Sequence, residues 1–408
     1  VIVIVAEKMI FIPTRPNNNE TVGEFNVYWN VPTFMCHKYG LHFEEVSQRY
    51  GILQNSMDNF RGDEIAILYD PGMFPNFERY SGKVVTRNGG VPQEGNLTKH
   101  LEVFREHLIN QIPDKSFHGV GVIDFESWRP IFRQNWASLQ PYKKLSIEIV
   151  RREHPFWDNQ SVEQEAKRRF EKYGKLFMEE TLKAAKQIRP SASWGYYAYP
   201  YCYNLTPNQH SSQCDSATVL ENDKMSWLFE LEDVLLPSVY FRLNLTSSQR
   251  VGLVGGRVRE IRHLITNRLI FKMNFSAQDD LEATLRKITD LGADGLILWG
   301  SSDDINTKQK CVEFREYLNN ELGPIVDRIR RTAVGLTQSN DTLVDNRIDV
   351  IFSFCRLRIR LPYTTYVEDP FDLRNRKISN TRHQSETKDY RFRRYLEMLR
   401  DVFEQRSK

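Results

Sequence analysis

The sequence predicts an α/β fold in which parallel strands close into a distorted (β/α) barrel of the TIM type. Short apolar runs alternate along the chain with longer segments of helical periodicity, and this alternation is typical of a parallel sheet. Several of these runs end in polar and aromatic residues, and a (β/α) barrel carries its active site at that end of its strands. A length of 408 residues, 40% of them hydrophobic, suffices for one barrel domain with an appendage.

Six segments are predicted to form the strands. They lie at residues 25–32, 64–72, 119–126, 193–200, 234–240 and 295–302. Pro32 ends the first of them, and Pro71 with Gly72 forms a turn after the second. The others end in carboxylates, tyrosines, or a tryptophan with serines, so the strand ends are rich in groups that could act on a ligand.

Helices are predicted between and after these strands. They lie at residues 41–50, 98–111, 160–188, 225–229, 256–266, 281–291 and 312–331. The longest, at 160–188, places Val162, Ala166 and Phe170 on one apolar side, and its many charges are expected to form a solvated face.

The predicted strand at 119–126 ends in two carboxylates, Asp124 and Glu126. Residues i and i+2 of a strand point to the same face, roughly 6–7 Å apart along the chain. Because two buried acids so close together are costly to ionise, one can keep its proton while the other carries the charge. A proton donor beside an anion is what glycoside hydrolysis requires. The alternative is a strand end with two solvated acids, and from these two residues alone it is the more common case.

Composition and charge restrict the function further. The net charge of +3 and the lack of a basic-aromatic motif argue against nucleic acid as a partner. No run reaches the roughly 18 apolar residues of a membrane span. Seven N-x-Ser/Thr sites favour a secreted, extracellular glycoprotein, and Asn96, Asn204 and Asn244 are our candidate glycan sites.

The five cysteines suit an oxidising compartment. Cys202 and Cys214 bracket a short polar loop, which favours a local disulfide, and Cys36 and Cys311 could tie the two ends of a domain together. Cys355 is left over. No Cys or His spacing indicates zinc, so we expect neither a metal nor a cofactor.

Three regions are predicted along the chain. Residues 1–23 are expected to be a leader, with a signal remnant and a polar linker. Residues 24–334 would form the catalytic barrel, and residues 335–408 a basic C-terminal extension of unknown role.

Eight long motifs carry a family resemblance. They read FNVYWNVPTFMCHKYG, AILYDPGMFP, GGVPQEGNLTKHL, GVGVIDFESWRPIFRQNWASL, WGYYAYPYCYNLTPNQ, ENDKMSWLFE, DLEATLRKITDLGADG and LWGSSDDI. Over about residues 25–332 the chain resembles the hyaluronidases of glycoside hydrolase family 56, among them the bee and wasp venom enzymes.

The resemblance implies a secreted endo-β-N-acetylhexosaminidase that cleaves the β-1,4 bonds of hyaluronan, with chondroitin as a further candidate substrate. It places the proton donor at Glu126 and its partner carboxylate at Asp124, with a hydrogen bond from Tyr240. It implies that the substrate's own N-acetyl oxygen is the nucleophile and that the configuration is retained. A role as a venom spreading factor and allergen would follow.

The resemblance also implies a substrate-binding set and a disulfide pattern. The substrate-binding residues would be Tyr69, Tyr197, Trp299 and Ser301. The disulfides would be Cys36–Cys311 and Cys202–Cys214, with no family partner for Cys355.

The interval 257–280 departs from the family pattern. The family carries a helix and an aromatic strand of the type PYYWYKYQ there, whereas this chain has the shorter REIRHLITNRLIFKMNFSAQD. Lys272 and Asn274 interrupt its one apolar run, so we expect residues 269–275 to be a surface or poorly packed segment, with one barrel strand missing or replaced. This departure supports an alternative function, namely a catalytically weak homologue that binds hyaluronan like a lectin.

Overall fold

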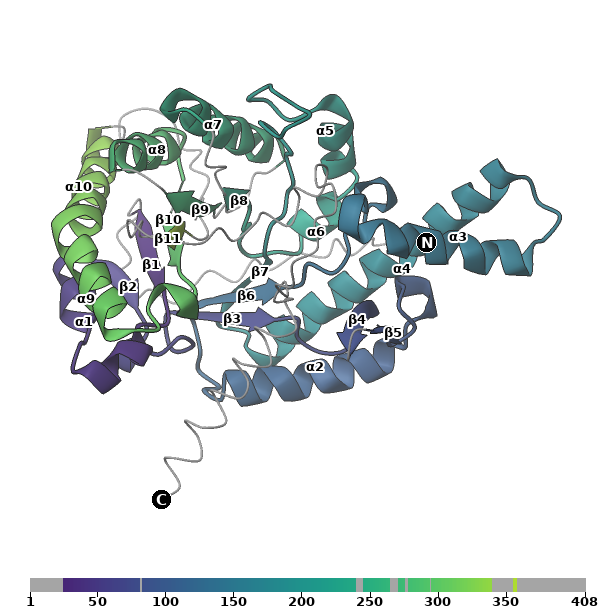
Figure 1. Cartoon of the computed structure of the whole chain (residues 1–408), viewed down its shortest axis with the longest axis horizontal. Coiled ribbons are helices and arrows are strands. Elements are labelled where there is room, and N and C mark those ends of the chain that lie inside the picture. Colours follow the sequence, from purple (N-terminus) through teal and green to yellow (C-terminus); the bar gives the residue numbers. More distant parts are fainter. Residues whose placement is uncertain are drawn as a thin grey trace, which may run out of the picture.

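The computed structural model describes residues 25–80, 83–239, 245–264, 271–275, 278–293, 295–339 and 355–357. Its strands lie at the centre of the molecule and its main helices lie around them (Figure 1). The predicted leader at 1–23 lies outside the described residues, as does most of the extension at 335–408. The architecture is α/β with parallel sheets, as the alternating sequence pattern predicts.

A three-stranded parallel sheet joins β3, β6 and β7, which are Ile65–Tyr69, Val120–Asp124 and Ser193–Tyr196. Every residue of β6 and β7 is buried, in keeping with their apolar sequences. Gly121 is required by packing, because a Cβ at this position would lie 2.5 Å from the Trp194 ring. All three strands were predicted from the sequence, and their observed bounds fall within the predicted ones.

A larger sheet has the order β2-β1-β10-β11-β9-β8 among the described residues. Its strands are β1 Asn26–Asn30, β2 Ile52–Gln54, β8 Ser238–Val239, β9 Phe271–Phe275, β10 Gly295–Trp299 and β11 Cys355–Leu357. All of its pairings are parallel. A parallel bridge between Tyr197 and Leu236 brings the end of β7 to the segment that precedes β8, so the two sheets meet there.

The segment expected to lie at the surface or to be poorly packed forms a strand. Phe271–Phe275 is β9, which pairs with β8 on one side and with β10 and β11 on the other. Strand pairing is made by backbone groups that Lys272 and Asn274 also possess, so these polar side chains do not prevent a strand here. Residues 269 and 270 lie outside the described part of the chain. The interval 257–280 therefore contributes a strand to this sheet.

Strand β11 comes from the extension that has no family counterpart. Cys355 pairs with Leu298 of β10 and with Met273 of β9, so the backbone of this short strand lies between them. Strands β9 and β10 pair directly only at their first residues, where Leu296 faces Phe271. Beyond that point β11 fills the space between β9 and β10.

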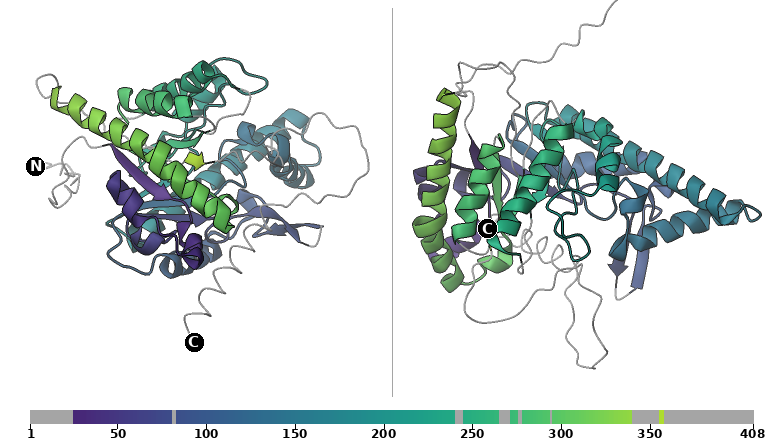
Figure 2. Two further views of the ribbon diagram at one scale, coloured as in Figure 1. Left: turned by 60° about the vertical axis from the view of Figure 1, so that its left-hand side comes forward. Right: turned by 90° about the horizontal axis from the view of Figure 1, so that it is seen from above.

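Ten helices cover the sheets in the described residues. They are α1 Glu44–Arg49, α2 Leu97–Gln111, α3 Gln140–Glu153, α4 Asn159–Ile188, α5 Ser216–Asp223, α6 Ser226–Phe229, α7 Ser247–Leu264, α8 Gln278–Asp290, α9 Lys308–Tyr317 and α10 Gly323–Ser339. Asp158 caps α4 by accepting a hydrogen bond from the Ser161 amide. Helix α4 buries Val162, Ala166 and Phe170, as predicted, and α3 and α4 project together from the rest of the molecule (Figure 2).

Shorter elements complete the structure. They are the antiparallel hairpin of β4 Asn76–Tyr80 and β5 Lys83–Arg87, the 3₁₀ turns η1 Thr33–Tyr39, η2 Ser56–Asp58, η3 Pro92–Glu94, η4 Phe132–Gln134, η5 Ala137–Leu139 and η6 Ser302–Asp304, and the π turn η7 Leu318–Leu322. The single helix predicted at 312–331 is divided by this π turn into α9 and α10.

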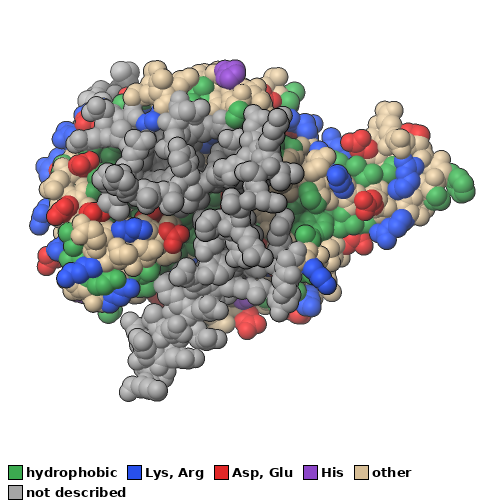
Figure 3. Space-filling view, viewed as in Figure 1, with side chains coloured by type: hydrophobic (Ala, Val, Ile, Leu, Met, Phe, Trp, Pro, Cys, Tyr) green, Lys and Arg blue, Asp and Glu red, His purple; other side chains and the backbone are tan. Residues whose placement is uncertain are grey.

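Two disulfides tie these elements together. Cys36 after β1 bonds to Cys311 in α9, and Cys202 bonds to Cys214 in the segment after β7. Acidic and basic side chains are interspersed on the visible surface, in keeping with the small net charge (Figure 3). No helix in the described ranges is both long and apolar enough to cross a membrane.

Candidate active site

The carboxyl ends of β3 and β6 place two of the predicted site residues side by side. Tyr69, the last residue of β3, is the register partner of Asp124, the last residue of β6. The next amide, that of Asp70, donates a hydrogen bond to the Asp124 carbonyl oxygen at 2.8 Å. Because parallel strands end on the same side, Tyr69 and Asp124 are held next to each other by backbone pairing alone.

The two predicted catalytic carboxylates have different surroundings. Asp124 is 8% exposed, whereas Glu126 is exposed. Strand β6 ends at Asp124, so the regular alternation that would place both side chains on one face stops there. Between them Phe125 is buried, with its ring stacked on Phe74 at 4.0 Å between centroids. This aromatic contact anchors the segment that carries Glu126 toward solvent.

Tyr69 and Trp299 join the two sheets at this edge. The Trp299 indole nitrogen donates a hydrogen bond to the Tyr69 hydroxyl oxygen at 2.7 Å, although the residues are 230 positions apart. The Tyr69 ring also stacks on Phe60, with an angle of 9° between the ring planes, and the Arg61 guanidinium lies over the Tyr69 ring. Two predicted sugar-binding rings are therefore in contact with each other.

Tyr197 directly follows β7, which is the edge strand opposite β3 in the smaller sheet. It is 3% exposed, and its hydroxyl donates to Ser238 Oγ in β8 at 3.2 Å. Tyr240, the predicted partner of Asp124, follows β8 and lies outside the described residues. Tyr197 thus reaches the strand from which Tyr240 would extend.

Ser301 has a structural partner. Its amide and its hydroxyl both donate to Asp304 Oδ2, at 2.8 and 2.9 Å, and this capping box starts the turn η6. The hydroxyl proton is thereby directed to Asp304, so Ser301 retains only its oxygen lone pairs for a ligand.

The sequence reasoning missed a buried arginine close to the acids. Arg129 is 7% exposed, and its guanidinium carbon lies 4.6 Å from the centre of the Tyr201 ring, 5.5 Å from that of Tyr203 and 5.6 Å from that of Trp136. A buried cation enclosed by aromatic faces is held in a fixed position three residues after Glu126. The signal was present as an arginine in ESWRP and two tyrosines in YCY, but only folding brings these motifs together.

A second network supports the strand end. Asp70, whose φ of 43° lies in the left-handed region, accepts hydrogen bonds from the Arg87 guanidinium at 2.8 and 2.9 Å. Arg87 in β5 also contacts Glu78 in β4 at 3.1 Å. The β4–β5 hairpin is thus fastened to the residue that follows Tyr69.

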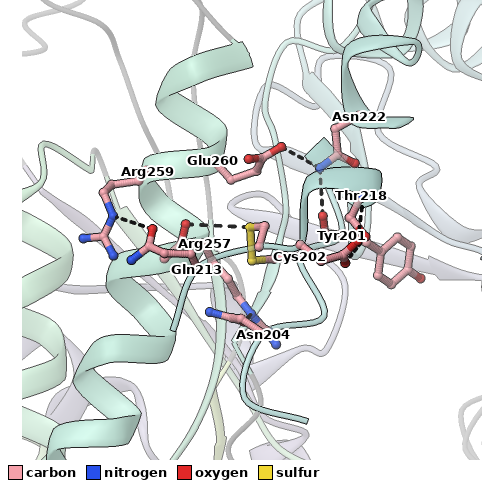
Figure 4. The surroundings of a disulfide bond; sticks show 12 residues. Tyr201, Cys202, Asn204, Gln213, Thr218, Asn222, Arg257, Arg259 and Glu260 are labelled. Carbon is pink, nitrogen blue, oxygen red and sulfur yellow. Dashed lines mark hydrogen bonds between the residues drawn. A yellow bond between two sulfur atoms is a disulfide. The ribbon is translucent and has the colours of Figure 1, made fainter. Parts of the chain in front are cut away.

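The structure contradicts the predicted glycan site at Asn204. This side chain is 1% exposed, and its amide nitrogen donates to the carbonyl oxygens of Ser212 and Leu253 at 2.8 and 2.9 Å. Its oxygen accepts from Arg257 Nε at 3.0 Å, beside the Cys202–Cys214 disulfide (Figure 4). A glycan would need this buried nitrogen to reach solvent, so the sequon match has a structural role instead.

The other two candidate glycan sites differ. Asn96 is exposed and caps α2, with its Oδ1 accepting from the Lys99 amide at 2.9 Å, so its nitrogen remains a predicted attachment point. Asn244 lies outside the described residues.

Comparisons with known proteins agree with this arrangement. The profile of a family described as hyaluronidase matches residues 16–340. A hyaluronidase of Apis mellifera is 72% identical over 358 residues, which cover 84% of this chain and 93% of that protein. A hyaluronidase of Dolichovespula maculata is 52% identical over 323 residues, which cover 76% of this chain and 97% of the relative.

A solved structure is similar as well. The crystal structure of bee venom hyaluronidase in complex with a hyaluronic acid tetramer superposes with a TM-score of 0.72 at 75% identity, covering 75% of this chain and 99% of the other. The family profile and both relatives extend over most of the chain, including the strand ends described above. The chain therefore belongs to the hyaluronidase family, glycoside hydrolase family 56.

Proposed function

We propose that this protein is an endo-β-N-acetylhexosaminidase that cleaves the β-1,4 bonds of hyaluronan, with retention and with assistance from the substrate. The observation that carries the proposal is the strand edge, where a buried Asp124 and an exposed Glu126 lie at the end of one strand. The similar bee venom enzyme was solved with a hyaluronic acid tetramer, which supports hyaluronan as the substrate; chondroitin is a further candidate.

The two sheets would together form one distorted barrel. The Tyr197–Leu236 bridge and the Trp299–Tyr69 hydrogen bond connect the two sheets at two places. Within each of these sheets all neighbouring strands are parallel. The catalytic domain would span residues 24–334, with the active site at the carboxyl ends of its strands.

The positions of the acids favour a nucleophile supplied by the substrate. An inverting pair needs its carboxyl groups roughly 6.5–9.5 Å apart, on opposite sides of the bond, so that a water fits between one of them and the sugar. Asp124 and Glu126 leave the same strand end and are two residues apart. This placement argues against an inverting pair, and from the mechanism that the family resemblance implies we infer that the acetamido oxygen of the reacting sugar attacks the anomeric carbon.

Each acid then has one role. Glu126, in contact with solvent, would protonate the leaving glycosidic oxygen as the bond to the anomeric carbon breaks. Buried Asp124, helped by Tyr240, would orient the acetamide and stabilise the positive charge of the oxazolinium ring that forms. Glu126 would finally remove a proton from the water that opens this ring, which returns Glu126 to its acid form.

Aromatic rings and hydroxyl groups would bind the hyaluronan chain. Trp299 and Tyr69 would present ring faces to sugar C–H groups, and their mutual hydrogen bond fixes their positions. Tyr197 would support the acetamide side through β8, and the oxygen of Ser301 would accept a hydrogen bond from the sugar chain. No cofactor takes part in this scheme.

The protein would act outside the cell. Two disulfides and the exposed sequon at Asn96 are consistent with an oxidising, secretory environment. The alternative of a catalytically weak binding protein is not favoured, because its basis was the missing strand, and β9 occupies that place.

The test is Glu126→Gln, which keeps the side-chain shape and removes the transferable proton. Turnover, measured by new reducing ends from hyaluronan, should fall by about 10²–10⁴-fold, while binding of hyaluronan oligosaccharides persists. Asp124→Asn should lose less, because it can still hydrogen-bond to the acetamide. Glu102→Gln, on the exposed side of α2, is the matched control and should retain full activity. An active Glu126→Gln variant would refute the assignment.

A further inference from the structure

A cluster of His37, His42 and Asp58 lies outside the strand edge and takes no part in the proposed hydrolysis. His37 belongs to η1, His42 lies just before α1, and Asp58 ends η2. One ligand atom from each of the three side chains can be chosen so that all lie within 4.8 Å of one another. Three segments thus bring two imidazoles and one carboxylate to a single point.

Asp58 is the fixed member of the cluster. Its side chain is fully buried, and Oδ2 lies 2.7 Å from His37 Nε2 and accepts from the Phe43 amide at 3.0 Å. Met57 and Asp58 have φ values of 59° and 56°, which place two consecutive non-glycine residues in the left-handed region. Such strain persists only where the surroundings hold it, and here it accompanies an inward-facing carboxylate.

The two histidines, unlike Asp58, are accessible to solvent. His42 is exposed, and the side chain of His37 is 32% exposed. Their rings are neighbours, with 4.3 Å between centroids and 33° between the planes. The neighbouring Lys38 ammonium lies over the Tyr39 ring, 4.9 Å from its centre.

We propose that His37, His42 and Asp58 bind one divalent transition-metal ion of the Zn²⁺ class. Two imidazoles with one carboxylate are a ligand set that suits zinc and its borderline neighbours, and three protein ligands leave a fourth position for water. Tetrahedral zinc with bonds of about 2.0–2.1 Å needs ligand atoms roughly 3.3 Å apart. The ligand atoms lie within 4.8 Å of one another and would reach that spacing by rotation of the exposed His42 and half-buried His37 side chains.

A metal at this site would stabilise the fold and would take no part in sugar cleavage. Cys36, next to His37, is bonded to Cys311, and Phe43, next to His42, packs on Trp29 of β1 and on Phe314 of α9. A metal there would link η1, η2 and the start of α1 beside that disulfide. The expectation of no metal overlooked this set, because its spacing matches no common zinc motif and Asp58 joins it only in the folded chain.

The simpler interpretation is that His37 and Asp58 form an ion pair and His42 is an uninvolved surface residue. Substitution of His42 therefore distinguishes the metal site from a simple ion pair, because only the metal site needs its imidazole. His263 offers a matched control, since it also pairs with an acid, with His263 Nε2 lying 3.3 Å from Asp223 Oδ1, but belongs to no three-residue metal cluster of the described residues.

The experiment uses the full chain after removal of metals by a chelator, titrated calorimetrically with Zn²⁺. We expect one ion per chain in the unchanged protein and in His263→Asn. His42→Asn should weaken binding about 100-fold or more, at least the loss caused by removing a partner of a metal ligand. Because His42 is exposed, this variant should melt at the same temperature as the parent when metal is absent. The proposal is overturned if no ion binds, or if His42→Asn binds Zn²⁺ as tightly as the parent protein.

Discussion

The two sheets reach the same parallel arrangement by different routes. In the smaller sheet β3, β6 and β7 lie side by side in the order in which they occur along the chain, with the β4–β5 hairpin between β3 and β6 in sequence, and each strand comes from one predicted apolar run. In the larger sheet β8, β9 and β10 are consecutive along the chain, but β1 from the start of the described residues pairs with β10, and β11 from the C-terminal extension lies between β9 and β10.

This difference separates two sources of strand stability. Strands β6 and β7 are buried throughout, and apolar side chains such as those of Val120, Val122 and Trp194 identify them from their own sequence. Strand β9 carries Lys272 and Asn274 in five residues, so its place depends on the backbone edges that β8 and β10 offer. Strands such as β6 and β7 can be predicted from their own residues. A strand such as β9 forms only when its neighbouring strands are in place.

The disulfides should show the largest contrast. The Cys36–Cys311 bridge starts just after β1 of the larger sheet and joins residues 275 positions apart. The Cys202–Cys214 bridge lies after β7 of the smaller sheet and joins residues 12 positions apart. The loop-entropy relation gives a loss in free energy of unfolding of about 6 kcal/mol for Cys36→Ser with Cys311→Ser, and about 3 kcal/mol for Cys202→Ser with Cys214→Ser. Denaturant unfolding of both double variants measures this difference. A greater loss from the short bridge would contradict it.

Removal of the extension tests the larger sheet alone. A chain ending at residue 339 lacks β11, so the backbone groups of β9 and β10 that pair with it lose their partners. At about 1 kcal/mol per hydrogen bond, we expect a loss of about 2–3 kcal/mol and a greater tendency to aggregate.

The matched control for this truncation is a chain ending at residue 357, which keeps β11. It should melt above the shorter form and stay monomeric at concentrations where the shorter form aggregates. Identical melting of the two truncated forms would show that β11 does not stabilise the sheet.

A smaller effect is expected beside the smaller sheet, at His100 in α2. His100 is fully buried, its Nδ1 accepts from the Met73 amide at 2.9 Å, and its Nε2 lies 2.7 Å from Thr181 Oγ1 in α4. Burial lowers the pKa of His100 to about 3. The unfolded chain, with an ordinary histidine pKa near 6.5, takes up this proton first, so stability present above pH 6.5 is lost as the pH falls toward about 3.

Denaturant unfolding at pH 7 and pH 5.5 measures this effect. The loss should approach about 1.4 kcal/mol per pH unit below pH 6.5, and His100→Asn should reduce that slope while lowering stability at pH 7. His210→Asn, which removes an exposed imidazole, serves as the control. Equal slopes in the parent and His100→Asn would refute this role of His100.

The candidate site was predictable only in part. The positions of Asp124, Tyr69 and Trp299 at strand ends could be predicted from the pattern of strand-forming residues, whereas the binding roles of Tyr69 and Trp299 were implied by the family resemblance. The Trp299–Tyr69 hydrogen bond, the aromatic enclosure of Arg129 and the burial of Asn204 could not be named. Each depends on residues far apart in the sequence, and a sequon has the same letters whether its amide is exposed or buried.

The sequence by itself determined the α/β class, the strands of the smaller sheet, the amphipathic α4 and the position of the acid pair. These features follow from local patterns of apolar and polar residues, which act over one helix or one strand. The tertiary structure decided that β9 and β11 complete the larger sheet, that Asn204 is buried, and that His37, His42 and Asp58 meet. Those outcomes depend on pairing and packing between distant segments, which no local pattern of the chain records.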